Sequence, residues 1–428
     1  MKKLMNPGRI IAFGFFSIIL IGALLFLLPI SQKTPGSVSF IDALFTSTSA
    51  VCVTGLSTFD AGSVLSAFGQ TVLILLIQLG GLGFVSISIG IVMMTGHKVF
   101  LKQQTLVKEA LNYGSLGGIF TLLKSVLFTT LIIEGVGALT LFPIFLKDYQ
   151  PLKALGLSIF HSISSFNNAG FDVFGKGNNI FPYRNNFPFL LITSLLIILG
   201  GIGFLVIKEV ASKRKFKKFT LHTKVVLTVT FLLLIGGTLI FKFTEEYDWL
   251  NAFFMSVSTR TAGFSTVDLS NISNAGLIFY SILMFIGASP TSTGGGIKTT
   301  TFLVVFMALY SYISENKTSI FKRTLPKELL HKAFVIFSMG IGTVISSLTL
   351  LCLTNPSISL NDLIFEVFSA FATVGLSTGI TPLLSVTGKL VVIVTMFIGR
   401  VGPLTIVSLW IVKNNSGVSY AEESLTLG

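Results

Sequence analysis

Long runs of apolar residues recur along the chain, and each is about as long as a helix that crosses a lipid bilayer. They include residues 10–30, 71–94, 190–210, 225–241, 334–353 and 390–412. A bilayer core needs roughly 20 predominantly apolar residues per helix. The first run is too long for a secretory signal and no small-residue cleavage site follows it, so we expect it to be a membrane span. The pattern predicts an all-α membrane protein.

Small, polar and aromatic residues recur in a fixed register between the apolar runs. Four phrases, "FTSTSAVCVTGLST", "FHSISSFNNAGFDV", "FFMSVSTRTAGFST" and "FEVFSAFATVGLST", each place a phenylalanine ten residues before a glycine. These glycines are Gly55, Gly170, Gly263 and Gly375. A second glycine follows 25, 30, 24 and 24 residues later, at Gly80, Gly200, Gly287 and Gly399. Because repetition in one register indicates copies of one structural unit, we expect four repeats.

Each repeat is predicted to contain an outer helix, a half-helix, a glycine-containing turn and an inner helix. The repeats cover residues 8–96, 115–213, 220–315 and 328–415 of a single pore domain, residues 1–428. The half-helices, at residues 39–52, 152–167, 247–260 and 360–373, are too short to cross a bilayer. Non-helical backbone at membrane depth is stable only inside protein or beside water, so we expect these half-helices to dip in and return around a central pore. The prediction is eight full spans plus four re-entrant half-helices, with an uninterrupted inner helix in every repeat but the third.

The charge pattern orients these spans. Only 11% of the residues are charged, against about 25% in soluble domains, and the net charge is +13. Lysine and arginine gather in short segments around residues 2–9, 97–108, 208–224 and 317–332, whereas the alternate loops carry aspartate and glutamate. By the positive-inside rule, the basic segments and both termini are cytoplasmic. Because topology explains the basic residues, we expect no nucleic-acid partner.

Few residues suit a metal centre or an enzyme. Cys52 and Cys352 lie far apart, and the four histidines show no ligand spacing, so neither a disulfide nor a zinc site is expected. No HExxH ligand pair and no nucleophile–base pair lies within the spans, so we do not expect an enzyme.

The turns after the half-helices are candidates for a cation filter. A cation that leaves water needs its hydration shell replaced, which a ring of backbone carbonyls does while half-helix C-termini point their negative ends at the ion. Glycine suits such a ring because a Cβ obstructs close backbone approach and positive φ. No acidic side chain adjoins these glycines, which favours potassium over divalent cations. Tight turns or close helix packing are the alternative explanation. The predicted filter residues, with potassium at their carbonyls as the only metal, are Val53, Thr54, Gly55, Asn168, Ala169, Gly170, Thr261, Ala262, Gly263, Thr373, Val374 and Gly375.

The inner helix of the third repeat contains helix-breaking residues and predicts a gate. Its sequence at residues 287–301 is "GASPTSTGGGIKTTT", in which a proline and three consecutive glycines would break a helix within the membrane. The predicted gate residues are Gly294, Gly295, Gly296, Lys298 and Arg400. Arg400 lies in the fourth inner helix, where a charge is costly and marks function. The alternatives are a static broken helix, and an arginine that caps loop carbonyls.

Other charged residues suggest roles in proton coupling, helix capping and docking. Glu134 lies within the second outer helix, ten residues after Lys124, and proton coupling through it is one alternative. Asp42 and Asp362 begin their half-helices, where a carboxylate would cap free N–H groups. The basic segments at residues 208–220 and 317–332 would contact anionic lipid or dock a regulatory subunit.

Two phrases resemble a known family. "TSAVCVTGLS" and "STRTAGFSTVD" are similar to the first and third filter segments of the Trk/Ktr/HKT potassium-transporter superfamily, and the resemblance extends along essentially the whole chain. The first repeat begins almost at Met1, which makes the chain more similar to the Ktr-type membrane subunits, KtrB, than to Trk-type members. The resemblance implies a potassium uptake pore in a bacterial plasma membrane, with the four glycines as filter residues and sodium stimulation in some members. It also implies a homodimer and a cytoplasmic, nucleotide-binding KtrA-type ring. The chain has no GxGxxG or Walker motif, so we expect it to bind no cofactor itself.

An alternating-access symporter coupled to sodium or protons is the competing hypothesis. Such proteins also contain repeats and broken helices, but the repeats are typically inverted or paired. The four units here run in the same direction, which favours a pore with quasi-fourfold symmetry. The sequence leaves ion coupling open.

Overall fold

The computed structural model describes residues 7–83, 86, 89, 119–175, 179–408 and 423, and most of these are helical. The basic segment at residues 97–108 lies outside the described residues. So do the C-terminal ends of the predicted repeats 8–96 and 328–415 and the N-terminal end of the repeat 115–213. Long helices are α1 (Pro7–Leu27), α7 (Ile119–Phe145), α11 (Leu221–Thr244) and α15 (Lys327–Thr354). Each is followed by a shorter helix: α2 (Phe40–Cys52), α8 (Pro151–Phe166), α12 (Trp249–Ser258) and α16 (Leu360–Ala372).

A further set of helices follows the predicted filter segments. These are α4 (Ala67–Leu82), α9 (Phe187–Ile202), α13 (Asn274–Phe285) and α17 (Val386–Val401). Short helices are α3 (Ala61–Val64), α10 (Phe204–Lys213), α14 (Thr299–Ile313) and α18 (Pro403–Ser408), with single 3-10 turns η1 (Pro29–Ser31), η2 (Phe181–Tyr183), η3 (Phe216–Lys218), η4 (Leu269–Asn271) and η5 (Thr381–Leu383). The antiparallel pair β1 (Ser319–Ile320) and β2 (Arg323–Thr324) connects α14 to α15.

The long helices are membrane spans by length and composition. In the described part of the chain, α1, α7, α11 and α15 qualify, which gives four spans. The number rises to five if the bent pair α9–α10 is counted as one span. Exposed leucine, isoleucine and phenylalanine side chains cover their outer faces, for example Phe128, Leu139 and Phe231. The chain is therefore a multi-pass membrane protein. The full count of eight spans stays a prediction.

The second and fourth inner helices are broken, so the prediction that they are uninterrupted was wrong. Helix α9 ends at Ile202, and α10 starts at Phe204 with a bend of 100°. Gly203 and Gly402 have φ of 92° and 93°, so each holds a left-handed backbone that ends the preceding helix. Gly83, at the end of α4, has φ of 76°. The inner helix of the third repeat is thus one of several that are interrupted, and its interruption is the most elaborate.

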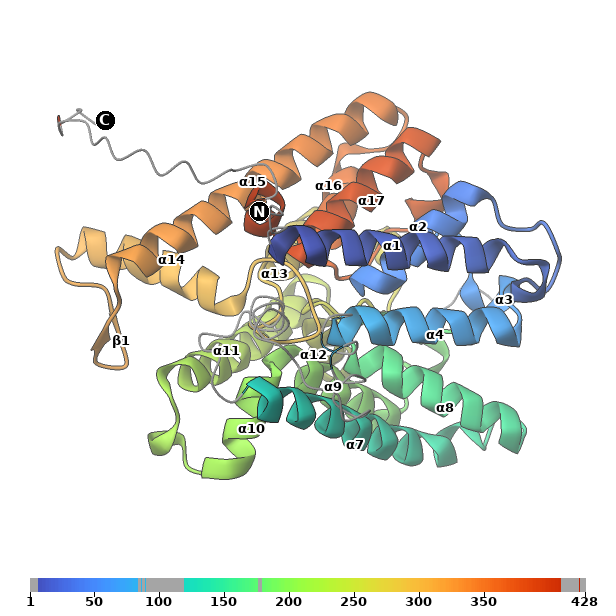
Figure 1. Ribbon diagram of the computed structural model, residues 1–428, viewed down its shortest axis with the longest axis horizontal. Coiled ribbons are helices and arrows are strands. Elements are labelled where there is room, and N and C mark those ends of the chain that lie inside the picture. The colour runs from blue at the N-terminus through green and yellow to red at the C-terminus, as the bar shows by residue number, and fades with distance from the viewer. Residues whose placement is uncertain are drawn as a thin grey trace, which may run out of the picture.

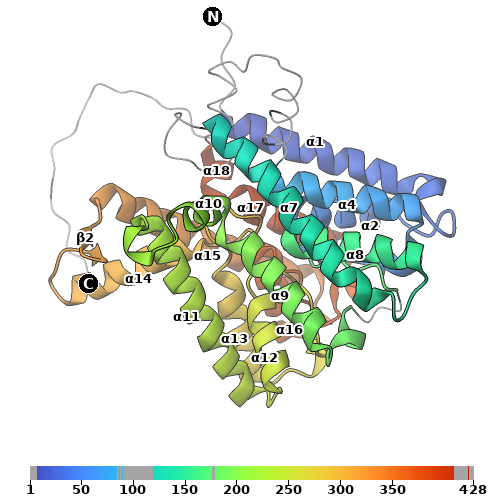
Figure 2. The ribbon, with the colours of Figure 1, turned by 90° about the horizontal axis from the view of Figure 1, so that it is seen from below.

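The helices close into a ring in chain order (Figures 1 and 2). Helix α4 packs against α8, α9 against α12, α13 against α16, and α17 against α2. Each inner helix therefore contacts the next short helix, and the last contacts the first. This arrangement directs the C-termini of α2, α8, α12 and α16 toward the interior of the ring.

The second set of repeated glycines lies where an inner helix meets a short helix. A Cβ on Gly80, Gly200 or Gly399 would overlap the backbone carbonyl oxygen of Val51, Phe166 or Phe371, respectively. Each of those carbonyls lies four residues before a predicted filter glycine. In the third unit, Gly287 instead packs against the carbonyl of Gly295. The recurrent spacing between the two glycine sets therefore reflects a packing contact.

Gly200→Ala should destabilise the fold at this contact. The added methyl would enter a closely packed backbone interface, and overpacking of this kind costs about 1–3 kcal/mol. We expect a lower melting temperature of the purified protein in detergent. Gly236→Ala is the matched control, because Gly236 is also in a helix but a Cβ there meets nothing within 4 Å. Equal melting temperatures for the two variants would contradict the contact.

The short helices begin differently from the prediction. The N-cap side chains are those of Ser39 and Ser359, which accept the backbone N–H of Asp42 and Asp362 at 3.2 Å. Each aspartate instead accepts a hydrogen bond from its serine hydroxyl, at 2.6 Å. Asp42 also pairs with Lys389 Nζ at 2.8 Å, which links α2 to α17. The hypothesis that the aspartates are the caps was wrong, because serine at the N-cap leaves the aspartate in the first turn.

Candidate functional site

The four predicted filter segments share one backbone conformation. The residue two places before each glycine is left-handed, with φ of 56° at Val53, 58° at Asn168, 71° at Thr261 and 52° at Thr373. The glycines themselves have φ of 96°, 68°, 78° and 94° in chain order. Non-glycine residues rarely adopt positive φ, so four in equivalent places indicate a required geometry. The chain turns sharply at the end of each short helix and then extends.

The four glycines lie next to one another in a closed ring. A Cβ on Gly55 would be 2.6 Å from the carbonyl oxygen of Ala169, and one on Gly170 would be 2.6 Å from that of Ala262. A Cβ on Gly263 would overlap the carbonyl oxygen of Val374, and one on Gly375 that of Thr54. Each segment therefore faces the next, and the fourth faces the first. At these positions only glycine fits.

The carbonyls of this ring are available to a ligand. Within the described part of the chain, no protein donor bonds the carbonyl oxygens of Thr54, Ala169, Ala262 or Val374. The backbone N–H groups of Gly55 and Gly375 are instead held by the hydroxyls of Ser49 and Ser369, each at 3.0 Å. Buried carbonyls are normally paired, and a group of four without donors has the chemistry to coordinate a cation.

The connection between α13 and α14, residues 286–298, is called the intramembrane loop. It lies directly against two of the filter segments. The Gly295 N–H donates to Thr373 Oγ1 at 2.9 Å, and a Cβ on Gly294 would overlap Thr261 Oγ1. The Thr293 hydroxyl lies within hydrogen-bond distance of the carbonyl oxygens of Phe166, at 3.3 Å, and Gly200, at 3.2 Å. The predicted gate glycines therefore lie beside the filter residues.

Arg400 ties this loop to the opposite side of the ring. Its Nη1 donates to the carbonyl of Thr293, and its Nη2 donates to the carbonyls of Gly80 and Gly81, the latter at 3.1 Å. Lys298 Nζ donates to the carbonyl of Gly294 at 2.6 Å, within the loop. Both cations thus cap loop carbonyls, while Arg400 also places a positive charge close to the filter.

The intramembrane loop packs against the break between α9 and α10. The Phe204 N–H donates to the carbonyl of Thr291 at 3.0 Å, and the Ser289 N–H donates to that of Gly201 at 3.0 Å. A Cβ on Gly203 would overlap the carbonyl oxygen of Pro290. The interrupted inner helix therefore supplies backbone partners that lipid cannot offer to a non-helical segment.

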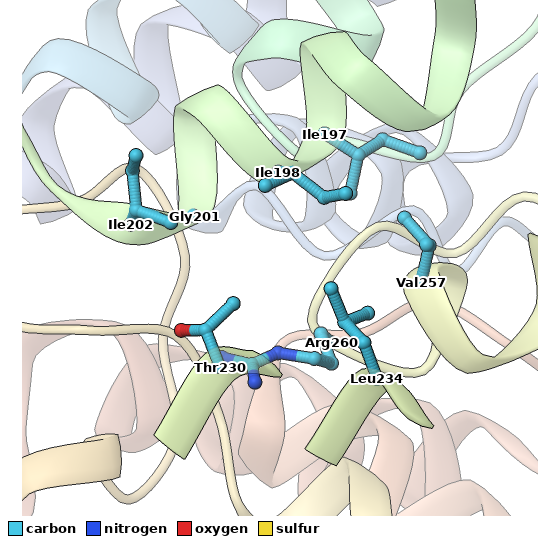
Figure 3. Close-up of a pocket in the computed structure, with 8 residues that line it drawn as sticks. All are labelled: Ile197, Ile198, Gly201, Ile202, Thr230, Leu234, Val257 and Arg260. Atoms are coloured by element: carbon cyan, nitrogen blue, oxygen red, sulfur yellow. The ribbon is translucent and has the colours of Figure 1, made fainter. Parts of the chain in front are cut away.

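Arg260 is a buried charge that the sequence interpretation missed. It precedes Thr261 in the third filter segment, is only 7% exposed, and has no hydrogen-bond partner at Nη1 among the described residues. Figure 3 shows its guanidinium extending toward Thr230, across a small cavity from Ile197 and Ile198. An alignment of the four phrases contains the signal, because the other three place a cysteine, an asparagine and an alanine where the third has this arginine.

Glu366, which the charge pattern counted among the acidic residues of the outward loops, is a second buried charge. It is fully buried in α16 and accepts hydrogen bonds from the hydroxyls of Ser377, at 2.7 Å, and Thr381, at 2.5 Å. These bonds fasten the segment that follows Gly375 to the short helix before it. The other three phrases place threonine, histidine and phenylalanine after their first phenylalanine, so alignment of the repeats contains the signal.

Comparisons with known proteins relate the whole chain to cation transporters. The profile of the TrkH family, described as cation transport protein, matches residues 27–421. The potassium/sodium uptake protein NtpJ of Enterococcus hirae is 39% identical over 445 residues, which cover 100% of this chain and 98% of that protein. Ktr system potassium uptake protein B of Bacillus subtilis is 40% identical over 438 residues, covering 99% and 97%. The crystal structure of the potassium transporter TrkH from Vibrio parahaemolyticus shares the fold, with a TM-score of 0.75 over 96% of this chain and 86% of that chain, at 19% identity.

Proposed function

The chain belongs to the TrkH family of cation transport proteins, and from this premise we propose that it is the potassium uptake pore subunit of a Ktr-type system. The family is a transporter family rather than an enzyme class. The observation that carries the proposal is the closed ring of four glycines with carbonyls that no protein donor bonds within the described residues. The names of relatives at about 40% identity, which mention potassium uptake, agree with it.

The ring supports selection by neutral oxygens. The carbonyl oxygens of Thr54, Ala169, Ala262 and Val374 would replace the hydration shell of potassium. The short helices α2, α8, α12 and α16 would contribute the negative ends of their dipoles. Hard divalent cations prefer carboxylate ligands, and none of the predicted filter residues carries a carboxylate. The ion would thus pass along the axis on which the four repeats converge.

The intramembrane loop would be the gate below this filter. Its backbone contacts two filter segments, and Arg400 holds it against the end of α4. A polar, glycine-rich segment that depends on a few such bonds is suited to move between a blocking and a permitting position. Arg400 would act as a tether, in line with the cap on loop carbonyls considered from the sequence, and also as an electrostatic barrier, a positive charge on the cytoplasmic side of the filter.

Regulation and assembly form part of the same proposal. Lysine and arginine side chains at residues 213–218 and 322–323 are exposed, and they would face the cytoplasm together with both termini. We propose that this surface contacts anionic lipid and docks a nucleotide-binding KtrA-type ring. A homodimer with one pore per subunit, and stimulation by sodium, complete the proposed system.

The proposal is tested by potassium uptake in bacterial cells that lack their own potassium importers. The chain, expressed alone and then with a KtrA-type partner, should restore growth at low potassium. Gly55→Asp should abolish the rescue, because Gly55 has φ of 96° and no room for a Cβ. Gly36→Asp is the matched control, since Gly36 has φ of 81° with nothing within 4 Å of a Cβ.

Two results would contradict the proposal. Rescue that persists in Gly55→Asp at normal membrane levels would exclude the ring as the filter. Failure of the wild-type chain in both settings, with folded protein in the membrane, would favour the alternating-access symporter or another cation.

A further inference from the structure

An intramembrane carboxylate is connected to the second filter segment. Glu134, in the outer helix α7, is only 7% exposed. Its Oε1 accepts from Asn167 Nδ2 at 2.9 Å, and its Oε2 accepts from Gln78 Nε2 at 3.1 Å. Asn167 Nδ2 also donates to Gln78 Oε1 at 2.8 Å, which closes a three-membered network. The network joins α4, α7 and the end of α8, so it crosses the boundary between the first and second repeats.

The carboxylate orients both amides. A carboxylate only accepts hydrogen bonds, whereas each amide has one acceptor oxygen and one donor nitrogen. Both amide nitrogens must therefore turn toward Glu134, and the Gln78 oxygen is left to accept from Asn167. The Asn167 oxygen then points at Gly81, where a Cβ would overlap it. Asn167 Nδ2 also donates to the carbonyl of Ile163 at 2.9 Å, so an amide or an apolar side chain at position 134 would leave that bond alone to orient the Asn167 amide.

The network adjoins both parts of the proposed transport machinery. Asn167 directly precedes Asn168, Ala169 and Gly170, the second filter segment. Gln78 lies two residues before Gly80, whose carbonyl accepts from Arg400. Glu134 is thus connected through Asn167 to the second filter segment and through Gln78 to the anchor of the intramembrane loop.

The position of Glu134 in the second repeat differs chemically from the equivalent positions in the first and third repeats. Three short helices direct a serine hydroxyl at the outer helix: Ser47 donates to the Ile19 carbonyl at 2.7 Å, Ser162 to the Glu134 carbonyl at 2.7 Å, and Ser256 to the Leu234 carbonyl at 2.8 Å. These contacts make Ile19, Glu134 and Leu234 equivalent. A carboxylate replaces an aliphatic side chain at one of them, and no lysine or arginine within the described residues pairs with it. Burying a charge without a cationic partner is costly, so packing alone does not account for it.

We infer that Glu134 is a positioning residue that fixes the second filter segment through Asn167 and so sets the discrimination between potassium and sodium. The inference rests on the proposed function, because it assigns Glu134 to the same filter. It differs from proton coupling, since the carboxylate acts here by accepting two fixed hydrogen bonds and binds no transported proton.

The test compares the potassium-to-sodium uptake ratio of Glu134→Gln with that of the wild type, in importer-deficient cells and in proteoliposomes. The substitution keeps the size of the side chain but replaces one acceptor with a donor, so the Gln78 amide loses its fixed orientation and the Asn167 amide keeps only its bond to the Ile163 carbonyl. We expect the ratio to fall about tenfold, which corresponds to about 1.4 kcal/mol. Gln78→Met keeps the volume and removes one bond to the carboxylate, and it should lower the ratio in the same direction by less.

Thr130→Val is the matched control. Thr130 lies one turn before Glu134 on the same buried side of α7, and its hydroxyl has no partner among the described residues. The Thr130→Val variant should leave the potassium-to-sodium uptake ratio unchanged even if its melting temperature shifts. A merely structural Glu134 would lower protein level or melting temperature without changing the ratio.

Each outcome decides the inference. A normal ratio in Glu134→Gln, with selective wild-type uptake, overturns the inference and leaves the proposed function intact. If Glu134→Gln does not accumulate in the membrane, a normal ratio in Gln78→Met overturns it equally. A wild-type chain that transports neither ion overturns the proposed function, and the positioning role falls with it.

Discussion

Gly375→Ala should reduce potassium uptake about 100-fold or more. Gly375 has φ of 94°, a conformation that strains any L-residue by about 1–3 kcal/mol. An alanine methyl would also overlap the carbonyl oxygen of Thr54, one of the four oxygens proposed to bind the ion. If the strain and the overlap together cost about 3 kcal/mol, the occupancy of the productive geometry falls about 100-fold. Initial rates of uptake, normalised to protein in the membrane, measure the effect.

Gly379→Ala separates the ring from simple backbone strain. Gly379 has φ of 96°, almost the same as Gly375, and lies four residues later, but a Cβ there meets nothing within 4 Å. Both variants therefore carry the same conformational strain, and only one obstructs the ring. We expect Gly379→Ala to retain most of the uptake. If the two variants lose uptake equally, strain in this segment rather than the carbonyl ring controls transport.

Arg400→Ala should raise cation flux about tenfold. The guanidinium donates to the carbonyls of Thr293, Gly80 and Gly81, and a hydrogen bond to a charged group contributes about 1.5–3 kcal/mol. Its loss should shift the intramembrane loop away from the blocking position by at least a factor of ten. It also removes a positive charge near the filter. Rubidium flux into proteoliposomes with equal amounts of each variant is the measurement.

Arg400→Lys distinguishes the tether from the electrostatic barrier. Lysine keeps the charge but lacks the planar fork that reaches several carbonyls at once. A flux as high as that of Arg400→Ala would identify the tether as the dominant effect, whereas a wild-type flux would identify the charge. Wild-type flux in both variants would restrict Arg400 to structural support of the loop.

The short helices were predictable because the repeated phrases mark them. The expected half-helices at residues 39–52 and 360–373 compare with α2 (Phe40–Cys52) and α16 (Leu360–Ala372). The phenylalanine that begins the first phrase, Phe45, is fully buried, as is its counterpart Phe365. In the third phrase Phe254 is fully buried in place of Phe253. A fixed register was thus a good guide to the elements and a poorer guide to single side chains.

The breaks in the second and fourth inner helices, unlike the break in the third, were not predictable from the pattern, and neither were the side-chain partners. The phrases "LGGLGF" and "LGGIGF" are apolar throughout, and nothing in their hydropathy shows which glycine adopts positive φ. Arg400 finds acceptors 107 and 320 residues away, and Glu134 finds donors 33 and 56 residues away. Such contacts depend on how the ring closes. Local sequence placed the charges, and only the three-dimensional arrangement supplied their partners.

The closure of the ring within one polypeptide has a genetic consequence. A ring of four identical chains repeats every substitution four times, whereas a single mutation here alters one quarter of the circumference. The quarters were thereby free to diverge after duplication, and the residue three places before each ring glycine is now Cys52, Asn167, Arg260 or Ala372. Each quarter can therefore acquire its own task, such as the arginine in one and the amide network in another, while the backbone around the axis stays nearly symmetric.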